Sequence, residues 1–121
     1  MRKLIILHSI LIITSCLFSG CLIRHGDFTV LSNKIVDVSD FELDKSDRTK
    51  GIVGKSVQHS VLFIPFGETP TLEGALDDGL EKGGGDVMTD AVVKYSWWYI
   101  PYIYGQFAWT VKGDVIKTRD K

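Results

Sequence analysis

The sequence predicts an α+β domain: a small antiparallel sheet of about four strands, in the order β-β-α-β-β, with one helix packed on one face. Apolar and polar residues alternate over 57–64, 87–99 and 107–115, which is the pattern of strands. Between the first two of these segments, residues 72–80 place apolar side chains at helical spacing. A chain of 121 residues that is 45% hydrophobic has room for one such domain.

The first 20 residues predict an export signal. Arg2 and Lys3 form a short positive region, and residues 4–18 form an apolar run with few polar interruptions. Because positive residues stay inside, we expect the C-terminal body outside the cytoplasm. Two other interpretations remain open: an uncleaved anchor over 4–23, which is about long enough to cross hydrocarbon, and an ordinary secreted protein.

The end of the apolar run resembles the lipobox of small bacterial lipoproteins, because Ser19 and Gly20 are small residues directly before Cys21. The resemblance implies cleavage after Gly20, transfer of a diacylglyceryl group to the sulfur of Cys21, and acylation of its new amine by fatty acids such as palmitate. A cysteine suits this step because its thiolate is a strong nucleophile. Cys16 is an alternative, but we prefer Cys21 because charged sequence begins soon after it, at Arg24.

This interpretation divides the chain into three parts: a signal peptide at 1–20, a lipidated N-terminus with an edge strand and a polar tether at 21–50, and the α+β domain at 51–121. The expected location is the extracytoplasmic face of the bacterial cell envelope, in the periplasm or at the cell surface. Leu22 favours the outer membrane, since an Asp there would resemble an inner-membrane retention signal. The expected partners are membrane lipid, through acylated Cys21, and an envelope protein.

Charge and chemistry exclude several classes. With 14 basic and 15 acidic residues the chain has no basic footprint for nucleic acid, and its hydrophobicity is too high for a disordered protein. Removal of the expected signal peptide would take away Arg2 and Lys3. The remaining chain would have 12 basic and 15 acidic residues, a net charge of −3. No nucleophile motif and no acid pair in an apolar setting is present, so we expect neither an enzyme nor a cofactor.

The segment from Thr69 to the glycines at 83–85 predicts the helix and its two ends. Thr69 is the expected cap, Pro70 the first helical residue, and the glycines the stop. The apolar stripe comprises Leu72, Ala75, Leu76 and Leu80. The acidic residues are Asp77, Asp78, Glu81 and Asp86. Carboxylates suit calcium, but the spacing fits no known loop, so a solvated helix face is preferred and no metal is expected.

The N-terminal half of the body carries weaker signals. Phe28 and Val30, followed by apolar residues at 35–38, predict an edge strand, and the charged stretch 40–50 predicts a solvated loop or tether. The strand at 57–64 is apolar on both faces toward its end, which predicts a central position. Residues 51–56 resemble a phosphate-binding loop, but Thr49 stands where that loop needs glycine, so we reject it.

Aromatic residues concentrate in the C-terminal hairpin. Eight of the thirteen lie at 95–109, namely Tyr95, Trp97, Trp98, Tyr99, Tyr102, Tyr104, Phe107 and Trp109. Trp97 and Trp98 are consecutive in a strand and must face opposite sides. Trp98, Tyr102 and Tyr104 are the candidate binding residues, for a partner protein, a glycan or the lipid headgroups. We expect the other five to form the core and a cross-strand ladder.

Four short stretches are similar to the TRL-like lipoprotein family, at 62–67, 75–80, 84–86 and 111–114. The shared features are a strand ending in glycine, a helix soon after, a glycine-rich stop and a closing hydrophobic strand. The resemblance implies an envelope location and no catalytic residue. The expected function is therefore a non-enzymatic structural or interaction module, with a small-ligand or glycan-binding module that uses the hairpin at 95–109 as the alternative.

Overall fold

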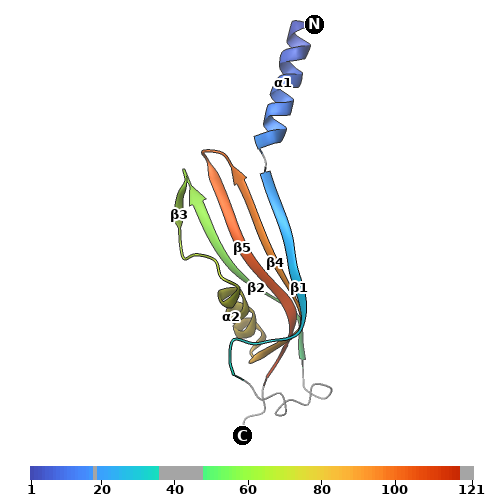
Figure 1. Ribbon diagram of the computed structural model, residues 1–121, viewed down its shortest axis with the longest axis vertical. Helices are drawn as coiled ribbons and strands as arrows, with labels where there is room; N and C mark the ends of the chain where they lie inside the picture. The colour runs from blue at the N-terminus through green and yellow to red at the C-terminus, as the bar shows by residue number, and fades with distance from the viewer. Residues whose placement is uncertain (18, 36–47, 118–121) are drawn as a thin grey trace.

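The computed structural model describes residues 1–17, 19–35 and 48–117 (Figure 1). Its elements in chain order are α1 (Arg2–Leu17), β1 (Ser19–Leu31), β2 (Arg48–Val61), β3 (Ile64–Phe66), α2 (Leu72–Gly83), β4 (Val87–Ile100) and β5 (Tyr104–Ile116). The strands form one antiparallel sheet in the order β1-β4-β5-β2-β3. The α+β class is confirmed. The sheet has five strands where about four were predicted, and α1 is a second helix.

Helix α2 covers part of one face of the sheet, which we call the helix face; the opposite side is the outer face. α2 packs mainly against β2 and β5. The core lies beneath it and is made of small and aliphatic side chains, which are Ala75, Leu76, Leu80, Met88, Ala91, Val93, Val111 and Val115. The predicted apolar stripe is therefore the buried side of α2, with Leu72 partly buried at its start.

The start of α2 differs from the prediction. Thr71, not Thr69, is the cap: its hydroxyl accepts a hydrogen bond from the amide of Gly74 at 3.0 Å. The amide of Thr71 donates to the hydroxyl of Ser56 on β2 at 3.2 Å, so a contact with the sheet selects the cap. Pro70 consequently lies before the helix instead of inside it. The glycine stop is confirmed, since Gly84 adopts a left-handed conformation with φ of 66°.

Strands β4 and β5 form the predicted antiparallel hairpin and occupy the middle of the sheet. Trp97 pairs with Phe107 and Tyr95 with Trp109, so these four aromatic residues share the helix face. Trp98 faces the other side, as predicted. A bulge between Thr89 and Val92 interrupts the ladder near the far end of the hairpin.

The central position predicted for the strand at 57–64 holds only over 59–61, which pair with a strand on each side. β2 has β5 on one side, and on the other only the three residues of β3. The strand also ends at Val61, and the apolar residues after it are exposed. A continuous apolar run indicated burial on both faces, but this run belongs to a turn at one end of the sheet.

The edge strand predicted from Phe28 and Val30 is β1, although it begins earlier, at Ser19. Ile35 lies beyond its end, and Val36, Val38 and most of the charged stretch fall outside the described residues. Helix α1 extends from the same end of the sheet at which β1 starts (Figure 1), and its apolar side chains over 4–13 are exposed. Among the described residues, no helix combines the length and apolarity needed to cross a membrane.

Candidate functional site

Cys21 lies near the start of β1, at the end of the sheet from which α1 extends (Figure 1). It is an exposed free cysteine in the described part of the chain. In the register of β1 with β4, Cys21 pairs with Trp97 and Gly20 pairs with Trp98. The predicted lipidation and cleavage residues are thus the direct neighbours of the predicted binding hairpin. No local pattern predicts this juxtaposition, because the pairing joins segments about 75 residues apart.

Two of the three candidate binding residues meet on the outer face. The rings of Trp98 and Tyr104 lie 5.1 Å apart, and the indole N–H of Trp98 donates to the side-chain oxygen of Gln106 at 2.8 Å. The hydroxyl of Tyr104 is hydrogen-bonded to Nδ1 of His59 on β2. Trp98 is 38% exposed. The cluster therefore presents an open aromatic surface whose polar atoms are already engaged.

Tyr102 does not join that cluster, because it lies in the turn between β4 and β5. The amide of Ile103 donates to the carbonyl of Ile100 at 3.1 Å, and Tyr102 has a φ of 62°. With Pro101 before it, this is a type II turn, whose third residue is normally Gly or Asn. The Tyr102 ring is 70% exposed and meets Phe63 edge-on at 5.2 Å.

A second turn, between β2 and β3, lies beside the first. Val61 pairs with Ile64, and the two residues between them, Leu62 and Phe63, have φ of 49° and 67°. Two positive φ values define a type I′ turn, which favours Asn-Gly. A left-handed backbone costs a residue with a side chain about 1–2 kcal/mol. The amide of Leu62 donates to the carbonyl of Ile103 at 3.4 Å and joins the two turns.

Of the five aromatic residues expected in the core, Trp109 packs against the core cluster, and the other four form the predicted ladder outside it. All five share the helix face beyond the start of α2 and are only partly buried; they are Tyr95, Trp97, Tyr99, Phe107 and Trp109. Phe63 and four of them line a shallow apolar groove. These rings stay partly exposed because α2 begins next to Trp109 and extends away from the groove. His25 packs on Trp109, with ring centroids 4.8 Å apart.

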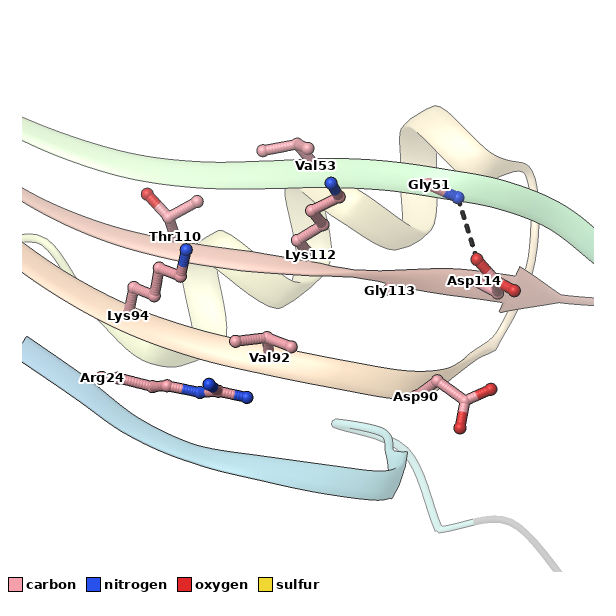
Figure 2. A pocket seen from close by; sticks show the side chains of 10 residues that line it. All are labelled: Arg24, Gly51, Val53, Asp90, Val92, Lys94, Thr110, Lys112, Gly113 and Asp114. Carbon is pink, nitrogen blue, oxygen red and sulfur yellow. Dashed lines mark hydrogen bonds between the residues drawn. The ribbon is translucent and has the colours of Figure 1, made fainter.

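Figure 2 shows a polar hollow on the outer face, toward the other end of the sheet. Arg24 and Lys94 are cross-strand neighbours, and Lys112 lies nearby on β5. The carboxylate of Asp27 accepts from the Arg24 guanidinium and raises the pKa of Arg24. Asp114 accepts from the amide of Gly51 at 2.9 Å. The hollow was not predicted because its residues come from separate strands.

The acidic residues considered for calcium are held apart by other partners. Asp78 accepts from Lys82 and from the amide of Lys55, Asp77 from Asn33, and Asp86 from Lys34. Within the described ranges, no group of three or more His, Cys, Asp or Glu side chains is placed to hold a metal ion. Residues 51–56, which resemble a phosphate loop in sequence, lie within strand β2.

Comparison with protein-family models, with curated proteins and with solved structures finds no match to the chain. The similarity to small bacterial lipoproteins, and to the TRL-like family in particular, therefore stays a prediction from the sequence. The candidate site consists of the exposed Cys21, two strained apolar turns and an open aromatic surface, all toward one end of the sheet.

Proposed function

We propose that this chain is a lipid-anchored protein of the bacterial cell envelope. Acyl chains on Cys21 hold it to the membrane, with the outer membrane preferred, and the body is a non-enzymatic structural or interaction module on the extracytoplasmic face. The observation that carries the proposal is the environment of Cys21: an exposed thiol at one end of the sheet, directly after Ser19 and Gly20 and an apolar run. Membrane lipid is the first partner, and an envelope protein the second.

The geometry of β1 is compatible with cleavage after Gly20. Such a cut removes only the pairs that Ser19 and Gly20 make with Tyr99 and Trp98. The strand from Cys21 onward keeps its pairing with β4, so the mature chain retains its edge strand. Burial of acyl chains contributes ~0.8 kcal/mol per CH₂, and two or more chains anchor a protein stably.

The test is to express the full chain in a bacterial host and to compare it with Cys21→Ser. For the wild type we expect recovery with the membranes and an intact mass equal to the chain from Cys21 plus its acyl groups. Cys21→Ser should be released into the soluble fraction or accumulate as precursor. Cys16→Ser is the matched control and should behave as the wild type. Membrane recovery and mass that do not change in Cys21→Ser would contradict the proposal.

A second candidate function is binding of a small ligand or glycan by the hairpin at 95–109. The observation that favours it is the outer-face cluster, where the stacking surface of Trp98 and Tyr104 lies beside the amide of Gln106. Ligand at this site should shift tryptophan emission, and Trp98→Ala should abolish the shift. The same substitution should leave the unfolding transition nearly unchanged, because Trp98 is outside the core. An emission spectrum insensitive to candidate sugars would count against this function.

A further inference from the structure

The end of the sheet that carries Cys21 exposes a group of large apolar side chains, which we call the apolar end. Its members come from β1, from β3 and from both turns, and each is between 43% and 70% exposed: Leu22, Ile23, Leu62, Phe63, Ile64, Phe66, Tyr102 and Ile103. The hydrogen bond between Leu62 and Ile103 holds the two turns together. Figure 1 shows both turns and the start of β1 at the end of the sheet from which α1 extends. Exposed apolar groups gathered in this way mark an interaction surface.

The apolar end is also the uncharged part of the molecule. Three segments without Asp, Glu, Lys or Arg meet there, at 19–23, 56–67 and 95–111. The first charge along β1 is Arg24, three residues beyond Cys21, which is about 10 Å of strand. Amphipathic helices that lie in the membrane interface bury their apolar face by roughly 5–10 Å, so the uncharged depth of β1 matches the depth of an interfacial contact.

Both turns break the local rules for their backbone conformation. Leu62, Phe63 and Tyr102 occupy left-handed positions where Gly or Asn would be favoured, and Asp90 is the only other non-glycine residue with positive φ in the described chain. Strain of this kind persists at positions that serve a function. Here it projects two aromatic rings and a leucine into solvent, where they add little to the core.

We propose that the turns at 62–63 and 101–103 insert into the lipid interface beside the anchor, so that the sheet stands with its apolar end on the membrane. The inference rests on the proposed function for the position of the bilayer, because acyl chains on Cys21 would place that bilayer at this end. Leu62 and Phe63 reach the boundary between the headgroups and the acyl chains. Tyr102 and the tryptophan side chains of the hairpin lie at the level of the headgroups, where such rings are enriched. A lipid surface is preferred to a second copy because Cys21, the proposed site of the acyl chains, lies at the same end.

The experiment places an environment-sensitive label on the turn. The full chain carrying Ile103→Cys is expressed, its lipidation is checked by intact mass, and the labelled protein is reconstituted into vesicles of phosphatidylethanolamine and phosphatidylglycerol. Lipids with a nitroxide near the headgroup should quench the fluorescence of the label at 103. The emission of this label should also shift to the blue. A label at Glu81, which is exposed on α2 at the other end, should show neither change. Equal, solvent-like signals at 103 and 81 would overturn the proposal.

A variant of the turn tests the mechanism without removing the anchor. Leu62→Asn combined with Phe63→Gly suits the type I′ turn, so the protein should fold, keep the wild-type mass and stay with the membranes. Quenching of the label at 103 should nevertheless fall to the level at 81. Ile35→Asn, which changes a fully exposed apolar residue after β1, is the control and should leave the quenching unchanged. Quenching that survives the turn variant would contradict insertion through these residues.

Failure of the anchor and failure of the insertion give different results. An unmodified Cys21 in the intact mass rejects the proposed function alone. In that case the label at 103 is attached to a chain that also carries Cys16→Ser and Cys21→Ser. This labelled protein is then floated with the same vesicles. Quenching there supports insertion independently of the anchor, and its absence rejects it. A blue shift without vesicles, together with a doubled mass in solution, would show that a second copy covers the apolar end.

Discussion

Gly54 of β2 lies directly against Gly79 of α2. A Cβ atom built on Gly54 would be 2.5 Å from the amide nitrogen of Gly79 and closer still to the carbonyl oxygen of Ala75. Helix and strand therefore meet backbone to backbone. Glycine at 79 weakens the isolated helix by about 1 kcal/mol relative to alanine, but it is what allows α2 to approach the sheet so closely.

Gly54→Ala should destabilise the protein strongly. Neither backbone atom near the new methyl group can move away without shifting α2, and overpacking of this kind costs typically 1–3 kcal/mol or more. The measurement is the urea midpoint followed by circular dichroism. Gly26→Ala is the matched control, because a Cβ there meets only the Phe28 ring at an ordinary 3.4 Å. A Gly54→Ala midpoint within error of the control would show that α2 docks differently.

The helix cap can be located by two threonine substitutions. Thr71→Ala removes the hydroxyl that accepts from Gly74 and should cost about 1 kcal/mol of unfolding free energy. Thr69→Ala should have little effect, because that residue is exposed and precedes the helix. Equilibrium unfolding of both variants decides between the two positions. A larger loss of unfolding free energy for Thr69→Ala would show that Thr69 is the cap, as the sequence suggests.

The turn variant that combines Leu62→Asn with Phe63→Gly should raise the stability. The left-handed backbone at positions 62 and 63 costs the two present side chains about 1–2 kcal/mol each, and the variant removes this strain. The gain is partly offset by loss of the aromatic contacts of Phe63 with Tyr99 and Tyr102, roughly 0.5–1.5 kcal/mol per pair. A net increase of about 1 kcal/mol is expected in thermal unfolding. A fall in melting temperature would mean that Phe63 contributes more to packing than its exposure suggests.

Asp78 should make stability depend on pH in the acid range. A hydrogen bond from the Lys82 side chain lowers the pKa of Asp78, a bond from the Lys55 amide lowers it further, and partial burial opposes both. Because the pKa is depressed in the folded protein, the carboxylate stabilises the fold above its unfolded pKa of about 3.9. This contribution is lost as the pH falls through the folded pKa.

Unfolding of the wild type and Asp78→Asn at several pH values measures this contribution. At pH 7 the wild type should be the more stable protein, and the difference should vanish in strong acid. Glu81→Gln, a change of the same kind on the exposed side of α2, should follow the wild-type profile. A difference between wild type and Asp78→Asn that grows as the pH falls would reverse the assigned sign.

The fold was predictable where the signal is local. The β4–β5 hairpin follows from alternation over more than a dozen residues on each side, and the end of α2 follows from its glycines. The start of α2 was not predictable, because two threonines near a proline are equivalent until Ser56 on another strand selects Thr71. The run at 62–64 was misassigned for a similar reason: apolar residues in sequence do not reveal whether they face a core or solvent.

The candidate site also has features that a local sequence signal predicts and features that only the tertiary structure determines. Cys21 and Gly20 carry a motif that is complete within five residues, and the outward position of Trp98 follows from its place next to Trp97. The meeting of Cys21 with Trp97, and of Leu62 with Ile103, depends on strand order and register, which no local pattern encodes. The positive φ of Tyr102 is likewise a tertiary result, since the residue type argues against it.

If the chain is anchored as proposed, the register of β1 also imposes an order in time. Ser19, Gly20 and Cys21 are paired with Tyr99, Trp98 and Trp97, so in the folded sheet the stretch that would be modified and cut is already bound in a ladder. An enzyme that reads an extended segment needs it before β1 joins β4, or after that end of the strand has frayed. Processing should therefore precede completion of the sheet, and β1 would act as the last strand to close, after the lipid is in place.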